Sequence, residues 1–188
     1  MDANGREWTP LSLVLASEYQ NQYEIAELLI DNGSNMDTYM KSSILVLLSE
    51  KYDSKHGSIY FTKEHKGQSD KYTFEVFMLL VENGASLEYW EGAKRFESSY
   101  QKLILEYLSI QGNVLIMEYL VEEADFNIND ILYAGDTALT VAIENDNLEL
   151  AQYLIDEGAD TTIVNEAGNT ALDIAIEKAD KEAIKMLE

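Results

Sequence analysis

The feature that most constrains this chain is a self-similar pattern near its C-terminal end. GDTALTVAIENDNLELAQYLIDEGAD begins at Gly135 and GNTALDIAIEKADKEAIKMLE begins at Gly168, so the two TAL tripeptides, at Thr137 and Thr170, differ by 33 positions. A fixed period of this length predicts a stack of small structural units, because one such unit is too short to bury its apolar side alone. Further copies are therefore expected upstream.

Each copy has the pattern of two short helices. After the threonine, apolar residues recur at spacings of three and four, which places them on one face of a helix. A polar break at residues 144–147 predicts a turn, and a second apolar series follows it and ends at Gly158, where glycine suits a left-handed C-cap. The apolar positions are Leu139, Ala142 and Ile143 in the first helix, Leu172, Ala175 and Ile176 in its copy, and Leu148, Leu150, Ala151, Leu154 and Ile155 in the second helix.

Three upstream segments repeat the pattern with decreasing fidelity. Residues 9–37 open with TPL and close with LLIDNG, and residues 103–129 keep the period but have Leu103 in place of the opening threonine. The remaining copy is split, with a first helix expected at residues 42–50 and a second at residues 72–86. The lysine-rich residues 51–71 interrupt it as an insertion.

The TPL and TAL openings, the closing pattern from Leu154 to Asp160 and the 33-residue spacing resemble the ankyrin repeat family. The resemblance implies an all-α fold, an ankyrin-type solenoid of about five helix-turn-helix repeats with β-turn fingers. The expected repeats are 2–37, 38–88 with the insertion 51–71, 89–130, 131–163 and 164–188, in a single domain. The sequence departs from the family pattern at one position of the repeat. Ser12, Thr140 or Asp173 replaces the histidine that usually follows TPL, so the hydrogen bonds that this histidine makes to adjacent repeats must be made by other residues or lost.

The charge balance restricts the classes of partner. The chain has 35 acidic and 13 basic residues, a formal net charge of -22, and eighteen of the acidic residues follow Asn113, where the only basic residues are Lys178, Lys181 and Lys185. Nucleic acid and anionic membranes would be repelled, whereas a basic protein would be attracted. Ordinary solvated helix faces would explain the same residues, so both interpretations stay open.

The insertion 51–71 differs from the rest, because its five lysines exceed three acidic residues. It is either a second contact surface on an exposed loop or hairpin, with β-forming residues from Ile59 to Thr62, or a solvated insertion of the kind repeat proteins tolerate. It also holds both histidines, His56 and His65. They lack the spacing and the further ligands of a metal site, so no metal is expected.

Nothing in the sequence predicts catalysis. The chain has no cysteine, and we find no phosphate-cradling glycine loop and no motif joining a serine to a histidine. We expect no enzyme and no cofactor. The N-terminus has neither a basic start nor an apolar run, and no stretch approaches the roughly 18 apolar residues of a membrane span, so we expect a cytoplasmic protein.

The resemblance implies a module that binds a folded protein through a concave face made by fingers and first helices. With the charge, this predicts a basic partner, and we expect the chain itself to be a monomer. Two alternatives are an immunity or inhibitor protein that masks a cationic toxin or nuclease, and a structural scaffold fragment of a larger repeat protein. The expected partner-binding residues occupy finger and helix positions: Trp90, Arg95, Tyr133, Asp136, Glu144, Glu166, Asn169 and Glu177.

Overall fold

The computed structural model describes residues 9–15, 21–34, 37–38, 41–42, 51–53, 58–60, 70–85 and 97–188. The chain divides into two compact units, Met1–Arg95 and Phe96–Glu188, each with its own packing. The predicted partner residues Trp90 and Arg95 and both histidines lie outside the described residues.

The first unit contains the helices α1 (Pro10–Leu15), α2 (Gln22–Asp31) and α4 (Asp70–Glu82). Helix α2 packs against both α1 and α4. Leu11, Ala26 and Phe77 are fully buried. The side-chain amide of Gln22 donates hydrogen bonds to the carbonyls of Val14 and Leu15 at 3.1 and 3.0 Å, which satisfies the end of α1. The helices predicted for the first copy, and the second helix of the split copy, are confirmed.

Two short antiparallel strand pairs belong to the same unit. Strand β1 (Asp37–Thr38) pairs with β2 (Lys41–Ser42), and β3 (Lys51–Asp53) pairs with β4 (Ser58–Tyr60). The second pair confirms the hairpin interpretation of the insertion for these six residues. The predicted helix at residues 42–50 is wrong at Ser42, whose backbone pairs with Asp37, and residues 43–50 lie outside the described part of the chain.

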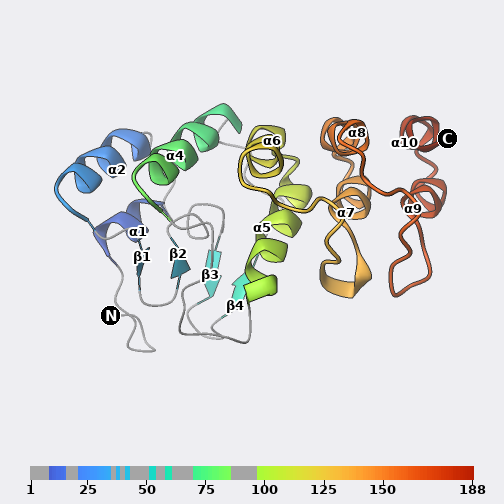
Figure 1. Cartoon of the computed structure of the whole chain (residues 1–188), viewed down its shortest axis with the longest axis horizontal. Helices are drawn as coiled ribbons and strands as arrows, with labels where there is room; N and C mark the ends of the chain where they lie inside the picture. Colours follow the sequence, from blue (N-terminus) through green and yellow to red (C-terminus); the bar gives the residue numbers. More distant parts are fainter. Residues whose placement is uncertain are drawn as a thin grey trace. The chain divides into compact units, whose positions relative to one another are not determined.

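The second unit is built from helix pairs. Its helices are α5 (Glu97–Gln111), α6 (Val114–Glu122), α7 (Ala138–Glu144), α8 (Leu148–Asp156), α9 (Ala171–Glu177) and α10 (Lys181–Leu187), with a 3-10 turn η1 (Tyr133–Gly135). First helices α5, α7 and α9 form one layer and second helices α6, α8 and α10 the other (Figure 1). This is the stack of small units that the repeat period predicts, and it agrees with the ankyrin-type solenoid that the resemblance implies.

Helix α5 corrects one expectation about the third copy. The third copy is expected to open at Leu103, but α5 already begins at Glu97. No glycine or proline interrupts residues 97–111, and an acidic residue at the start of a helix is favourable. The helix therefore extends six residues before the predicted opening at Leu103.

Local capping explains where the first helices of the last two pairs begin. The Thr137 backbone N–H donates to the Thr140 hydroxyl at 2.8 Å, and the Thr140 N–H donates to the Thr137 hydroxyl at 3.3 Å. Thr170 and Asp173 form the same reciprocal capping box, with 2.9 Å from the Thr170 N–H to the carboxylate. The residues in the usual histidine position thus bond within their own repeat.

Other residues make the bonds between repeats. The Asn147 side-chain amide at the start of α8 donates to the carbonyls of Ser109 and Ile110, in α5 of the preceding pair, at 2.8 and 2.9 Å. Gly112 makes room for it, because a Cβ there would lie 2.8 Å from the Asn147 side chain. Lys178, at the end of α9, donates to the Glu144 carbonyl at 2.7 Å and pairs with the Asp146 carboxylate at 2.6 Å.

The core of the second unit lies between consecutive helix pairs. Leu139 of α7 and Leu154 of α8, both predicted to be core residues, expose 1% and 0% of their surface. Helix α7 packs between α5 and α9, and α8 between α6 and α10. The middle pair is therefore covered on both sides, which confirms the helical register read from the sequence.

Candidate partner-binding surface

Two fingers of the second unit, which contain residues 132–136 and 165–169, have the same closed backbone turn. In the first finger, the Leu132 N–H donates to the Asp136 carbonyl at 2.7 Å. In the second, the Asn165 N–H donates to the Asn169 carbonyl at 3.0 Å, 33 positions further along the chain. Both segments lie on the same side of the unit, beyond α7 and α9 (Figure 1). Each finger is thus a closed loop held next to its first helix.

The two fingers are also bonded to each other. The Glu166 N–H donates to the Ala134 carbonyl at 2.9 Å, and the Asn165 side-chain amide donates to the Asp136 carboxylate at the same distance. Gly135 lies directly under this contact, since a Cβ on it would come 2.8 Å from the Glu166 nitrogen. The absence of a side chain at Gly135 therefore permits the close approach of the fingers.

A third bond joins the two repeats where the fingers begin. The Asp160 N–H donates to the side-chain oxygen of Asn129 at 2.8 Å. The Asp160 carboxylate in turn accepts from the hydroxyl and the N–H of Thr162 at 2.6 and 2.9 Å, and these bonds lower the pKa of Asp160. The second finger is thus bonded to the preceding repeat at Asp160 as well as at Asn165 and Glu166.

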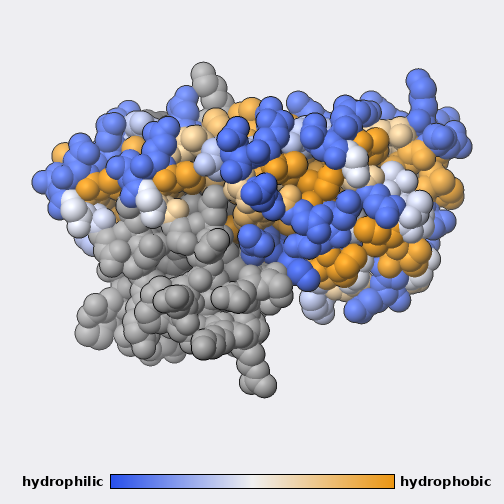
Figure 2. All heavy atoms as spheres, viewed as in Figure 1, coloured by the Kyte–Doolittle hydropathy of each residue, from blue (hydrophilic) through white to orange (hydrophobic). Residues whose placement is uncertain are grey.

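Apolar side chains project from this surface. Tyr133 exposes 81% of its area, Val164 55% and Ile131 45%, and Ile131 and Val164 occupy equivalent positions 33 residues apart. Figure 2 shows apolar orange atoms gathered around the fingers between blue, hydrophilic neighbours. Large exposed aromatic residues of this kind contribute strongly to protein interfaces, because they bury much area at a small entropic cost.

The same repeats also carry exposed carboxylates. Glu144 at the end of α7, Glu166 in the second finger and Glu177 at the end of α9 are exposed. Partial desolvation of its carboxyl raises the pKa of Glu144, nearby Asp136 raises this pKa further, and Lys178 lowers it. Burial and then Asp136 likewise raise the pKa of Glu106 on α5. The first helices and the fingers therefore share an acidic surface.

The predicted site residues divide into two groups in this arrangement. Tyr133, Glu144, Glu166 and Glu177 are exposed, whereas Asp136 and Asn169 are partly buried and take part in the bonds that shape the fingers. Sequence reasoning missed Glu106, although the repeat register places it 34 positions before Thr140 and thus at the usual histidine position. We call Ile131, Tyr133, Glu144, Val164, Glu166 and Glu177 the finger face.

The described residues offer neither a metal cluster nor a membrane-spanning helix. Within the described ranges, no three histidine, cysteine or acidic side chains are grouped so that they could hold a metal ion. Among the same residues, no helix has both the length and the apolar character needed to cross a membrane. The finger face is the candidate functional site because it combines exposed apolar side chains with exposed carboxylates.

Stacked helix pairs with bonded fingers define a repeat protein of the ankyrin type. The family described as ankyrin repeats (3 copies) matches residues 105–188. Notch-regulated ankyrin repeat-containing protein B of Danio rerio is 36% identical over 81 residues, which cover 42% of this chain and 72% of that protein. The chain belongs to the ankyrin repeat family, whose repeats generally mediate protein–protein interactions.

Two further similarities involve only a small part of the other protein. The NAD-capped RNA hydrolase NUDT12 of Macaca fascicularis is 30% identical over 81 residues, which are 42% of this chain and 18% of that enzyme. Ankyrin repeat and SAM domain-containing protein 6 of Rattus norvegicus is 34% identical over 82 residues, 9% of its length. The matched segment thus spans less than a fifth of either protein, and the likeness to NUDT12 lies in its ankyrin repeats.

Proposed function

We propose that this chain binds a folded, basic protein through the finger face. The observation that carries the proposal is the pair of hydrogen-bonded fingers, which expose Tyr133, Val164 and Glu166. The apolar side chains supply area to bury, and the carboxylates attract and orient a cationic partner. A rigid pair of fingers also loses little freedom on binding.

The charge supports a basic partner and not merely any protein. Residues 114–170 contain thirteen acidic and no basic residues. A like-charged partner would be repelled before it reached the apolar side chains, whereas a cationic one would associate faster. We propose a non-catalytic role in the cytoplasm. An inhibitor or immunity protein that masks a cationic toxin or nuclease is a narrower form of the same hypothesis, and a scaffold block within a longer repeat protein is the other.

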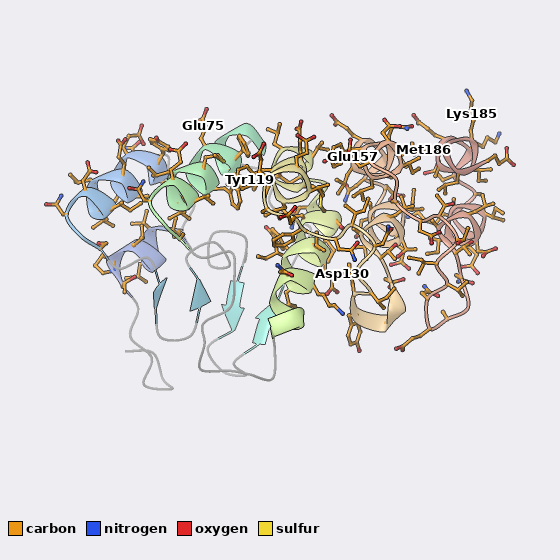
Figure 3. All side chains as sticks on the ribbon, viewed as in Figure 1. Glu75, Tyr119, Asp130, Glu157, Lys185 and Met186 are labelled. Atoms are coloured by element: carbon orange, nitrogen blue, oxygen red, sulfur yellow. The ribbon has the colours of Figure 1, made fainter. Side chains whose placement is uncertain are left out.

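The test starts from capture of partners by the full chain and their identification by mass spectrometry. Binding is then measured for a variant with Glu144, Glu166 and Glu177 all changed to lysine. The matched control changes Glu118, Glu122 and Glu157 to lysine, which alters the net charge equally but on the second helices; Figure 3 shows Glu157 in that layer. The proposal predicts a loss of affinity of about 100-fold for the first variant and less than about 5-fold for the control.

Equal effects of the two triple variants would show that net charge alone attracts the partner, and the finger face would lose its role. A partner with no basic surface would contradict the charge argument. A cationic nuclease or toxin whose activity falls on binding would select the inhibitor form. Asp136 is left unchanged in this design, because its carboxylate bonds to Asn165 and its reversal would also disrupt the fingers.

A further inference from the structure

Two helices of the first unit end on the same pair of residues. Asn32 and Gly33 follow α2, Asn83 and Gly84 follow α4, and all four residues are exposed. Both glycines have positive φ, +77° and +86°, as expected for the left-handed residue that closes a helix. Among the residues that the structure describes, no other asparagine precedes a glycine. The pair is therefore a distinctive feature of these two helix ends.

An asparagine that precedes a glycine can lose its side-chain amide without a catalyst. The glycine nitrogen gives up its proton and attacks Cγ of the asparagine, because no Cβ on the glycine obstructs this approach. The new N–Cγ bond forms as the Cγ–Nδ2 bond breaks, and Nδ2 takes up the proton and leaves as ammonia. Water then opens the cyclic imide to aspartate or isoaspartate. The net reaction is the hydrolysis of an amide, and only water is consumed.

The folded helix ends hold both reacting groups in hydrogen bonds. At α2, the Gly33 N–H donates to the Ile30 carbonyl at 2.8 Å. The Asn32 side-chain amide donates to the Leu28 carbonyl at 2.7 Å. The same bonds at α4 join Gly84 to Val81 at 2.9 Å and Asn83 to Leu79 at 2.8 Å. The glycine nitrogen can attack only after the last turn has opened, and exposed helix ends open more readily than a core does. The fold therefore sets the rate of the reaction.

The end of α7 supplies a comparison within the same chain. Asn145 donates its side-chain amide to the Val141 carbonyl at 2.8 Å, and the N–H of the next residue, Asp146, donates to the Ile143 carbonyl at 3.2 Å. Asp146 also has positive φ, +62°. These are the bonds and the backbone conformation found after α2 and α4, but Asp146 has a Cβ beside the nitrogen that would attack. Asn145 should therefore react much more slowly than the two asparagines of the first unit.

We propose that Asn32 and Asn83 are sites of spontaneous deamidation, which proceeds when the last turn of α2 or α4 opens and which then keeps that turn open. Either product has a carboxylate in place of the donating amide, so the bond to the helix carbonyl is lost. The new negative charge also lies at the negative end of the helix dipole, where it is unfavourable. The modification acts on the first unit and not on the finger face, so the inference goes beyond the proposed function.

Isoaspartate disturbs the helix ends further, because it inserts an additional carbon atom into the backbone before the glycine. The bonds that close these ends beyond the glycine run from Ser34 to Leu29 and from Ala85 to Leu80, both at 2.9 Å. They lose their register when the backbone lengthens. The end of α8 has the same bond, from Ala159 to Leu154 at 2.8 Å, but Glu157 occupies the asparagine position. Helix α8 is therefore a reference that cannot undergo this change.

The test incubates the full chain in warm, mildly alkaline buffer, with and without urea, and follows each asparagine by peptide mass spectrometry. Asn32 and Asn83 should lose their amides at least about ten-fold faster than Asn145. Urea should accelerate the two reactions, because it opens the helix ends. Asp146→Gly should make Asn145 reactive. The matched control is Asp146→Asn, which also removes the carboxylate that pairs with Lys178 but keeps a Cβ, and it should leave Asn145 unreactive.

Hydrogen exchange of the chain after incubation without urea tests the structural consequence. The N–H groups of Ser34 and Ala85 should exchange about ten-fold or more faster than in fresh protein, whereas that of Ala159 should be unchanged. Three results would overturn the proposal. One is deamidation of Asn145 as fast as that of the two asparagines of the first unit, and another is a rate that urea does not raise. The third is a deamidated chain whose Ser34 and Ala85 N–H groups exchange as in fresh protein.

Discussion

Asn165 donates its side-chain amide to the Asp136 carboxylate at 2.9 Å, which joins the fingers of two successive repeats. The Asn165 side-chain oxygen accepts at the same time from the N–H groups of Ala167 and Asn169, at 3.1 and 3.0 Å. One side chain therefore shapes its own finger and fixes it to the preceding one. Removing it should affect both stability and the geometry of the finger face.

We expect Asn165→Ala to lower the free energy of unfolding by about 1–3 kcal/mol, because it leaves partly buried groups without their partners. Urea denaturation monitored by circular dichroism measures this. Gln152→Ala is the control: Gln152 is exposed and bonds only to Asp156 one turn further along α8, a contact that contributes about 0.2–0.5 kcal/mol. Equal losses for the two variants would contradict the coupling of the fingers.

Leu139→Ala and Leu154→Ala should each destabilise the chain by about 2–5 kcal/mol, since both side chains are buried between helix pairs and leave cavities. Leu115→Ala on α6 should cost less than about 1 kcal/mol, because Leu115 is 37% exposed. Chemical denaturation of all three compares them directly. Losses below about 0.5 kcal/mol at both buried positions would mean that the packing between repeats is different.

A comparison of Gly135→Ala with Gly168→Ala distinguishes the cost of backbone strain from the cost of a steric clash. Both glycines have positive φ, +79° and +88°, so alanine at either position should cost about 1–2 kcal/mol. At Gly168 nothing lies within 4 Å of the added Cβ, but at Gly135 the Cβ would come 2.8 Å from the Glu166 nitrogen. Thermal melts should therefore show a clearly larger loss for Gly135→Ala. An equal loss would mean that the fingers separate freely.

Stability should depend on pH through Glu106 and Glu144. Burial, and after it Asp136, raises the pKa of both carboxyls above the ordinary value of 4.5. The folded state then holds protons that the unfolded state has already released, so the free energy of unfolding should fall as pH rises through these raised values. Glu106→Gln should flatten this part of the profile above the ordinary value of 4.5, as measured by urea denaturation at a series of pH values. An unchanged slope would exclude Glu106 as its source.

At lower pH, the free energy of unfolding is expected to change with pH in the opposite direction. Hydrogen bonds from Thr162 and Thr170 lower the pKa values of Asp160 and Asp173 below the ordinary 3.8. These carboxylates contribute stability that is present above 3.8 and is lost as pH falls through their folded values. Thr170→Val should reduce the acid loss, because it removes the hydroxyl that bonds to Asp173 at 2.6 Å. A steeper acid loss in this variant would contradict the assignment.

The dependence of binding kinetics on salt distinguishes the two sources of partner affinity, which are long-range charge attraction and the burial of side chains. Raising the ionic strength from about 50 to about 500 mM shortens the screening length from about 14 to about 4 Å, so association with a cationic partner should slow about ten-fold or more. Dissociation should change much less, because burial of side chains such as Tyr133 holds the complex. Stopped-flow or surface-based kinetics with an identified partner measures both rates. A salt-independent association rate would remove the steering role of the charge.

The repeat period, the helix pairs of the last repeats and their cores follow from local sequence patterns. Apolar spacing is a local property, and so are the capping boxes at Thr137 and Thr170, since each involves residues only three positions apart. Leu139 and Leu154 could therefore be assigned to the core without knowledge of their neighbours. The longer α5 was missed, because the repeat register ended the pattern at Leu103 although helix-compatible residues continue before it.

Tertiary structure alone decided which residues meet across repeats. Asp136 and Asn165 are 29 positions apart in the sequence, and Ser109 and Asn147 are 38 positions apart. No local sequence pattern specifies a hydrogen bond across such separations. Ile143 and Ile176 have the same place in the repeat, yet one is buried and the other exposed, because burial depends on whether a neighbouring helix pair covers the residue. Periodicity thus specifies the unit, whereas stacking determines which of its surfaces remain available for binding.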